Sequence, residues 1–232
     1  MGGGVGISCH GSHRIVGETS RIAMPECGIG LVPDVGGSFL LRQKSVTLGT
    51  YLGTTCSQME ANDAIFAGFA DYFIPEEKWT EAKSQLIETG NPSFFKGLSI
   101  NLPESHLSKH SDIIEEVFSE TSHTSLVKKL AQHPQFSNAL ARLKKASPLS
   151  VLVTINMLRM PEISYSVKTA LEIEYRYTAR AQEHTDFQEG IRAMVVDKDK
   201  NPTWMHPSLD SVTQKESLWF LQPLNSKLEL RF

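Results

Sequence analysis

The chain has 232 residues, 40% hydrophobic and 21% charged, a composition typical of globular proteins and long enough for one large domain or two small ones. With 23 basic and 26 acidic residues the net charge is -3, and no block of lysines and arginines interrupts this balance, so neither nucleic acid nor an anionic membrane is expected as a partner. No apolar run approaches the roughly 18 residues of a membrane-spanning helix, and three cysteines without paired or metal-ligand spacing indicate a reducing compartment.

The first 75 residues predict short elements that are separated by glycine and proline. One of these elements begins with a capping box, Ser57-Gln58-Met59-Glu60, which predicts the start of a helix that ends at Gly68. The remaining predicted elements are a helix over 5–10, buried strands over 14–16 and 22–24 with Glu26 just past the second, short helices over 36–42 and 46–52, and a strand over 71–74.

Beyond Pro75 the pattern becomes helical. An Asp112-x-x-Glu115 box precedes one of these helices, and the last has an apolar stripe at Val167, Ala170, Leu171 and Tyr175. The predicted helices cover 78–89, 113–119, 126–132, 139–145, 148–158 and 167–182. The chain is therefore expected to consist of a region over 1–75 and a helical region over 76–232.

A glycine run and two carboxylates are the candidate functional residues. In Gly2-Gly3-Gly4 no side chain blocks the approach of a ligand to the backbone N–H groups, and a helix that begins there directs its positive end at an oxyanion. Glu26 and Asp34 each lie among proline and glycine, so that their backbones are stiff and their oxygens can be held in one place. Donors together with carboxylates indicate acyl chemistry.

Each feature alone has a structural explanation. The glycine run could be a tight turn, and Glu26 and Asp34 could be helix caps or turn residues; only their joint spacing favours a site. The glycines do not fit a dinucleotide-binding fingerprint, and Gly6-x-Ser8-x-His10 lacks the final glycine of a nucleophile elbow. The histidines are scattered and predict no metal site: His10, His13, His106, His110, His123 and His133.

These motifs and their spacing resemble the crotonase (enoyl-CoA hydratase/isomerase) superfamily, and within it the 3-hydroxyisobutyryl-CoA hydrolases. Hydratases of the superfamily carry a glutamate directly after GGG-x, where this chain has Gly6. The motifs that resemble the hydrolase branch are Met24-Pro25-Glu26, Pro33-Asp34-Val35-Gly36-Gly37, Ser147-Pro148 with Ser150, Glu174-Tyr175-Arg176, Asp186-Phe187 with Glu189-Gly190 and Arg192-Ala193, Asp197-Lys198-Asp199 with Pro202 and Trp204, and the ending Leu228-Glu229-Leu230-Arg231-Phe232.

The resemblance implies an α/β, crotonase-like (ClpP/crotonase) spiral fold that is truncated at its N-terminus and largely helical in its C-terminal half. Residues 1–75 then correspond to the C-terminal part of the catalytic core. Family members have a long segment before the glycine motif, which carries a second oxyanion-hole donor and the loop that binds the CoA nucleotide. We therefore expect a fragment, a misassigned gene start or a degraded relative, with an ending close to the natural one.

The resemblance also implies a chemistry: hydrolysis of 3-hydroxyisobutyryl-CoA in valine catabolism. The Gly3 N–H would polarise the thioester carbonyl, Glu26 would activate water or attack directly, and Asp34 would orient the substrate hydroxyl or the water. No metal or redox cofactor is implied, since CoA enters as part of the acyl-CoA substrate.

Further expectations concern assembly, compartment and alternatives. A homo-oligomer is a possible assembly. The expected compartment is the cytoplasm for a bacterial protein, with the mitochondrial matrix as the alternative. Arg176 and the charged residues over 186–197 are expected to form a salt-bridged packing seam. The alternatives are an enoyl-CoA hydratase or isomerase, which Gly6 disfavours, and a non-catalytic scaffold or assembly subunit.

Overall fold

The computed structural model describes residues 1–120, 123–230 and 232, without the side chain of His123. Short helices surround a small parallel sheet in which β1 (Ile15–Val16) pairs with β2 (Tyr72–Phe73), Ile15 opposite Tyr72. The α-helices that precede β2 in the chain are α1 (Gly3–Ser8), α2 (Gly37–Leu41), α3 (Val46–Thr55) and α4 (Ala61–Phe66). A 3-10 turn, η1 (Glu26–Ile29), lies between α1 and α2 in the chain.

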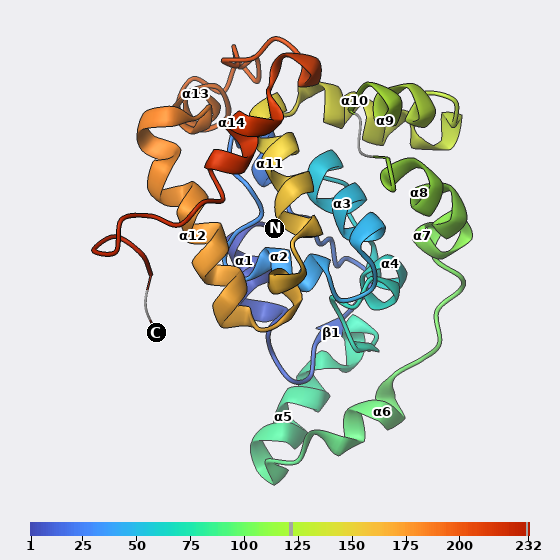
Figure 1. Ribbon diagram of the computed structural model, residues 1–232. Coiled ribbons are helices and arrows are strands. Elements are labelled where there is room, and N and C mark those ends of the chain that lie inside the picture. The colour runs from blue at the N-terminus through green and yellow to red at the C-terminus, as the bar shows by residue number, and fades with distance from the viewer. Residues whose placement is uncertain (121–122, 231) are drawn as a thin grey trace.

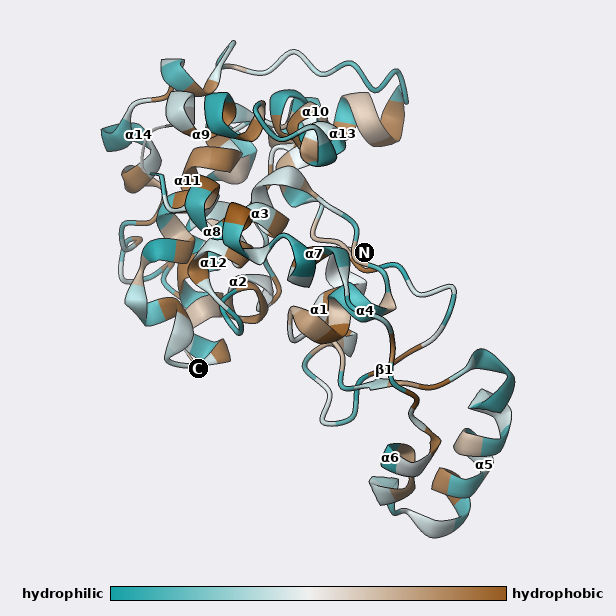
Figure 2. Ribbon diagram, turned by 90° about the vertical axis from the view of Figure 1, so that its right-hand side faces the viewer, coloured by the Kyte–Doolittle hydropathy of each residue, from teal (hydrophilic) through white to brown (hydrophobic). Residues whose placement is uncertain are grey.

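The rest of the described chain is helical and wraps around this part (Figure 1). Its α-helices in chain order are α5 (Trp79–Thr89), α6 (Phe95–Leu98), α7 (His106–Lys109), α8 (Ser111–Phe118), α9 (His123–Leu130), α10 (Ser137–Lys145), α11 (Pro148–Arg159), α12 (Val167–His184), α13 (Phe187–Ile191) and α14 (Gln214–Trp219). A π-helical turn, η6 (Arg192–Val196), directly follows α13. The helices α5 and α6 form an arm that projects from the body beyond β1 (Figure 2).

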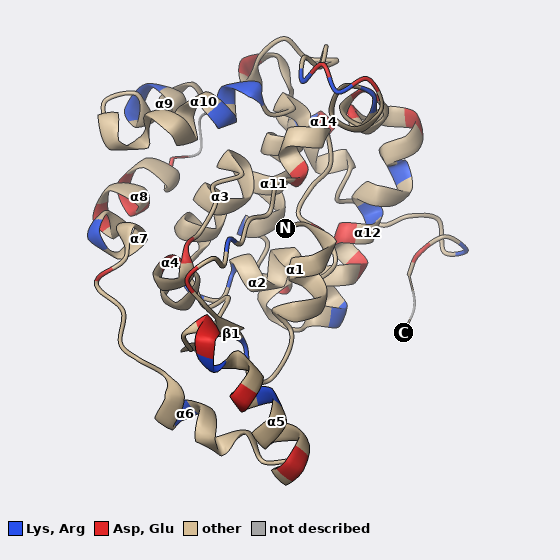
Figure 3. Cartoon of the chain, turned by 180° about the vertical axis from the view of Figure 1, so that it is seen from behind, with Lys and Arg blue, Asp and Glu red and all other residues tan. Residues whose placement is uncertain are grey.

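The centre of the molecule is built by α3 and α11, which pack against each other. Both helices are buried along nearly their whole length, because apolar and small residues cover every face. Thr50, Thr54 and Thr55 are buried in α3, and each hydroxyl donates to the carbonyl four residues earlier, which satisfies these polar groups without water. Charged residues lie mainly on the outer helices such as α5, α8, α10 and α12 (Figure 3).

Several predicted elements are confirmed with small shifts in their ends. Helices form at 37–41, 46–55, 79–89, 111–118, 137–145 and 148–159. Ser147 caps α11 by accepting the Ser150 N–H, as its Ser-Pro-x-Ser motif predicts. The first helix begins at Gly3 rather than at residue 5.

Other local predictions are wrong. The segment 22–24 forms only a bridge between Ile22 and Met59 instead of a strand, and Glu26 begins a 3-10 turn rather than following a strand. The box at Ser57 caps no helix, because its hydroxyl bonds to Thr55 and Tyr51 and α4 begins after Glu60. Likewise α8 begins before Asp112, with His110 as its N-cap.

The buried face of α12 also differs from the predicted stripe. Ala170 is buried as expected, but the other buried positions of this helix are Ile173, Glu174, Tyr177 and Ala181. This face meets α2 and α13, so tertiary contacts rather than hydropathy alone set which side of the helix faces inward. Compared with the predicted stripe, the buried face is displaced around the axis of α12, and Glu174 therefore lies in the interior.

Candidate active site

The glycine run forms a turn that opens directly into α1. Gly2 has φ 59, in the left-handed region that favours glycine, and its N–H donates to the carbonyl of Ala23 at 3.2 Å. Gly3 and Gly4 follow at the start of the helix, where N–H groups have no intrahelical partner. Both are exposed, and a Cβ on either would meet nothing within 4 Å. A ligand can therefore reach this backbone.

Glu26 lies beside this turn, in the interior. It is the first residue of η1 and is only 3% exposed. A Cβ on Gly2 would lie 3.3 Å from the Glu26 Oε1, so the carboxylate faces the glycine turn. The Glu26 Oε2 is buried and has no hydrogen-bond partner within the described chain. A buried oxygen without a partner is costly and calls for a functional explanation.

The surroundings of Glu26 favour its protonated form. Burial, with a smaller contribution from the negative charges of Asp34 and Glu174, raises the pKa of its carboxyl to about 8, against the opposing effects of a backbone hydrogen bond and the N-terminal amine. A carboxyl with a pKa this close to neutrality is suited to exchange protons with a substrate or a water molecule.

The turn η1 that carries Glu26 is held by the C-terminal helices. Gly30, with φ 74, ends the turn, and its carbonyl accepts the buried Tyr177 hydroxyl at 2.9 Å. Gly190 of α13 lies so close to Ile29 that a Cβ there would be 2.1 Å from the Ile29 carbonyl oxygen. The backbone around Glu26 therefore has little freedom to move.

Asp34, the second candidate, is half-buried in the loop before α2. Its carbonyl accepts the Gly37 N–H at 2.7 Å, and the two residues between them, Val35 and Gly36, have φ 53 and φ 77. Burial raises the pKa of the Asp34 carboxyl. Because its charge also raises the pKa of Glu26, the two carboxyls belong to one electrostatic environment.

Glu174 is a third carboxylate of this environment, and sequence reasoning missed its place there. It lies on α12, is 2% exposed, and accepts the N–H groups of Gly36 (2.8 Å) and Ser38 (3.0 Å) as well as the Ser38 hydroxyl. Burial raises its pKa to about 7, against the opposing hydrogen bonds and with a further upward contribution from Asp34. A glutamate between Ile173 and Tyr177 on an apolar helix face was the signal in the sequence.

A cavity of about 430 Å³ lies next to the backbone of η1, with Pro25, Gly28 and Ile29 among its lining residues, and has a basic rim. Three cations line it, Arg142 and Lys145 from α10 and Lys200 from the C-terminal loop, and none of them forms an ion pair within the described part of the chain. The other lining residues include Met1, Ala23, Pro25, Gly28, Ile29, Cys56, Met194 and Pro202. A larger cavity of about 640 Å³ lies between α5, α6 and the sheet, away from these carboxylates.

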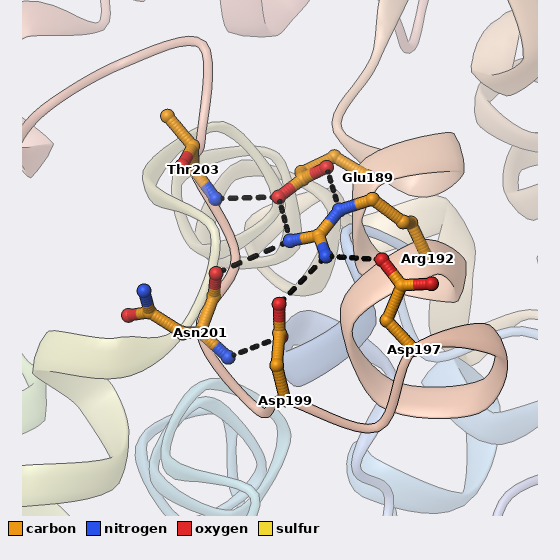
Figure 4. A network of polar contacts seen from close by, with 6 residues as sticks. All are labelled: Glu189, Arg192, Asp197, Asp199, Asn201 and Thr203. Carbon is orange, nitrogen blue, oxygen red and sulfur yellow. Dashed lines mark hydrogen bonds and ion pairs between the residues drawn. The ribbon is translucent and has the colours of Figure 1, made fainter.

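Arg192 holds the loop that forms one wall of the smaller cavity (Figure 4). Its guanidinium binds Glu189 through two hydrogen bonds of 2.7 and 2.8 Å and binds Asp197 and Asp199 at 2.7 Å each. The bonds that Glu189 accepts from Arg192 and from the Thr203 N–H lower its pKa to about 2. Arg176 and Arg192 thus form ion pairs, as predicted, but not one seam: Arg176 pairs with Glu229, and the buried Asp186 accepts hydrogen bonds from the Ser147 hydroxyl and the Met205 N–H instead.

A family model described as enoyl-CoA hydratase/isomerase matches residues 1–221. The chain belongs to this family. It is 42% identical to an enoyl-CoA hydratase from Rhodobacter sphaeroides, with a TM-score of 0.91 over 100% of this chain and 68% of that one. A carnitinyl-CoA dehydratase from Mycobacterium thermoresistibile gives 32% identity and a TM-score of 0.91, with 67% of that chain covered. These likenesses confirm the crotonase-like fold.

Curated relatives carry the name 3-hydroxyisobutyryl-CoA hydrolase, mitochondrial. The Dictyostelium discoideum protein is 34% identical over 100% of this chain and 64% of its own length. For the Mus musculus protein the values are 33%, 100% and 63%, and for the Homo sapiens protein 34%, 93% and 59%. The chain therefore spans less than two thirds of the length of these relatives, and it resembles the hydrolase branch as the sequence motifs predict.

The remaining candidate groups are histidines and cysteines, of which Cys56 lines the smaller cavity. His106 and His110 pack against Phe136 with ring centroids 5.7 and 5.6 Å away, and the side chain of His123 is outside the described part. Cys9, Cys27 and Cys56 are free. Within the described residues no group of three or more histidines, cysteines or acidic residues could hold a metal ion. No described helix has the length and apolarity to span a membrane.

Proposed function

We propose that this protein hydrolyses a short-chain acyl-CoA thioester, specifically 3-hydroxyisobutyryl-CoA to 3-hydroxyisobutyrate and CoA. The observation that carries the proposal is the buried Glu26 carboxyl, whose Oε2 has no partner among the described residues and whose Oε1 faces the glycine turn. The names of the curated relatives supply the substrate.

In the proposed reaction the Gly3 N–H donates to the thioester carbonyl oxygen, where negative charge develops. Donors of this kind are worth about 3–4 kcal/mol, or ~100- to 1,000-fold in rate. Ionised Glu26 removes a proton from water as the water oxygen attacks the carbonyl carbon. The C–S bond then breaks and the CoA thiolate leaves, taking up a proton. In the alternative route Glu26 itself attacks, giving an anhydride that water cleaves.

Asp34 has a separate role in this proposal. Its half-buried carboxyl orients the substrate hydroxyl or the attacking water, while the raised pKa of about 8 leaves Glu26 as the stronger base of the pair. The basic rim of the neighbouring cavity, with Arg142, Lys145 and Lys200, suits the phosphates of CoA. The relatives are named as mitochondrial proteins, and the compartment proposed for this protein is accordingly the mitochondrial matrix, or the cytoplasm if it is bacterial.

The second candidate function is hydration, which is favoured by the likeness to the Rhodobacter sphaeroides enoyl-CoA hydratase and opposed by the absence of a glutamate at Gly6. The test measures thiol release from 3-hydroxyisobutyryl-CoA and loss of enoyl absorbance from crotonyl-CoA, with this chain and with a version extended by the upstream segment of its relatives. We expect the extended protein to release thiol from 3-hydroxyisobutyryl-CoA faster than it hydrates crotonyl-CoA. Hydration that is faster than thiol release would overturn the proposal, and loss of both activities with intact folding would favour a scaffold.

The two routes of hydrolysis differ in where solvent oxygen goes. In a single turnover in ¹⁸O-water, an anhydride that water cleaves at the Glu26 carbonyl would place one ¹⁸O in the Glu26 carboxyl, whereas attack by water on the substrate carbonyl labels only the released acid. Mass spectrometry of the peptide that carries Glu26 distinguishes the two.

A further inference from the structure

Glu174 is a buried carboxylate that the proposed reaction does not use. It belongs to α12, far along the chain from the Asp34 turn, yet its two oxygens accept three hydrogen bonds from Gly36 and Ser38. We propose that Glu174 is a positioning residue that fixes the turn carrying Asp34 and so sets how Asp34 faces Glu26. The inference rests on the proposed function in so far as this pair carries the chemistry.

The conformation of the turn requires an external anchor. Val35 has φ 53, a region that β-branched residues adopt rarely and at a cost of about 1–3 kcal/mol. Such a conformation persists only where the surroundings determine it. Inside the turn, the Gly37 N–H donates to the Asp34 carbonyl. The two flanking N–H groups, those of Gly36 and Ser38, donate to the carboxylate of Glu174 outside the turn.

The position of Gly36 is restricted from other sides as well. A Cβ on Gly36 would lie 2.4 Å from the His10 Nε2 and 3.3 Å from the Val167 Cγ1. The backbone therefore passes between His10, which follows α1, and Val167 of α12, with the carboxylate of Glu174 as its polar contact. A shift of this backbone would move Asp34, which is only two residues away.

Besides holding the turn, Glu174 acts on Glu26 through its negative charge. The titratable groups around the turn are Glu26, Asp34, His10 and the N-terminal amine. Both Asp34 and Glu174 raise the pKa of Glu26 through their negative charge. Neutralising Glu174 removes one of these contributions, and any outward movement of Asp34 weakens the other. Both effects lower the pKa of Glu26.

The test compares Glu174→Gln with Glu229→Gln. Glu229 anchors the C-terminal segment to Arg176 of the same helix and accepts the Leu224 N–H, so its amide variant loses comparable bonds away from the turn. Amide exchange of Gly36 and Ser38 reports on the turn, ¹³C carboxyl titration reports on Glu26, and thiol release gives kcat and KM. Ser38→Ala, which keeps the charge of Glu174 and removes one donor, is a milder second variant.

For Glu174→Gln we expect faster exchange at Gly36 and Ser38, a lower pKa of Glu26, and a fall of about 10- to 100-fold in kcat that exceeds any rise in KM, since small displacements of reacting groups cost this much. Ser38→Ala is also expected to speed up amide exchange in the turn and to lower kcat, each by a smaller amount. Glu229→Gln changes none of these quantities. A Glu174→Gln variant with an unchanged Glu26 pKa and kcat would overturn the inference and leave Glu174 a purely structural residue.

The design separates this inference from the proposed function. If neither this chain nor its extended version releases thiol, the proposed function fails, while exchange and titration still show whether Glu174 controls the turn and Glu26. If thiol release is normal in wild type and in Glu174→Gln alike, only the positioning role fails.

Discussion

Val35 fills the space beside Gly6. A Cβ on Gly6 would lie 2.3 Å from the Val35 Cγ2 and 2.7 Å from the Val35 carbonyl oxygen. The contact depends on the left-handed conformation of Val35, which turns its side chain and carbonyl toward α1. Position 6 is where hydratases of the superfamily carry a glutamate, so this site has no room for that residue while the turn keeps its present conformation.

The first prediction concerns this contact. Gly6→Ala is expected to lower the free energy of unfolding by about 1–3 kcal/mol, because the new methyl group overlaps both side chain and backbone of Val35. Gly4→Ala is the matched control in the same helix: its Cβ meets nothing, and alanine favours the helix by about 0.5–1 kcal/mol. Urea denaturation measures both. Equal stability of the two variants would mean that Val35 moves aside without cost.

The second prediction is the pH dependence of stability at Glu26. Its pKa is about 8 in the folded chain and near 4.5 ordinarily, so the folded state holds the proton more tightly than the unfolded state does. Its contribution to stability is complete below about pH 4.5 and is lost as the pH rises through about 8.

Glu26→Gln mimics the protonated form and is therefore expected to stabilise the protein by a few kcal/mol, on the order of the pKa difference, at pH 9, with the gain vanishing toward pH 4.5. Glu174 is present in both proteins, so only the part of its titration that depends on the charge of Glu26 differs between them. Thermal unfolding at pH 5, 7 and 9 gives the difference in Tm, and a difference independent of pH would contradict the raised pKa.

The third prediction concerns the roles of the two carboxylates in turnover. Glu26→Gln abolishes thiol release with little change in substrate binding, because the amide can neither accept a proton nor attack. In the wild-type protein kcat/KM rises with pH and levels off above about 8, as Glu26 ionises. Near-normal kcat in Glu26→Gln would make Glu26 a structural residue.

The fourth prediction is that Asp34→Asn moves this pH profile. Removing the Asp34 charge lowers the pKa of Glu26, so the rise of kcat/KM is displaced to lower pH. Turnover also falls, with a larger share of the effect in KM than for Glu26→Gln, since Asp34 positions substrate or water. An unshifted profile would indicate that the two carboxyls do not interact.

The fifth prediction concerns the wall of the basic cavity. Arg192→Gln removes the bonds to Glu189, Asp197 and Asp199 and is expected to increase amide exchange over 197–203 and to raise KM for acyl-CoA more than it lowers kcat. Arg21→Gln, which breaks an exposed ion pair with Glu60, is the control and leaves both unchanged. An unaltered KM with a loosened loop would remove the cavity from the substrate site.

Local chemistry made much of this protein predictable. The glycine turn, Glu26 and Asp34 were recognisable as a joint pattern because their flanking glycines and prolines define short, rigid backbone segments whatever the rest of the chain does. The start of α11 at Ser147-Pro148 was predictable for the same reason, since a cap and an N-terminal proline act within one turn.

Long-range packing was responsible for the features that the sequence did not reveal. Glu174 reaches Gly36 and Ser38 only because α12 turns its apolar face, and this glutamate with it, against α2. Likewise, Arg142 and Lys200 line one cavity because α13 packs on η1 and Arg192 folds back the loop that follows. Hydropathy and capping act over a few residues, whereas the burial of a particular helix face depends on which partner covers it. The candidate carboxylates could therefore be read from the chain, while their environment, and with it the raised pKa of Glu26, arose only when distant segments came together.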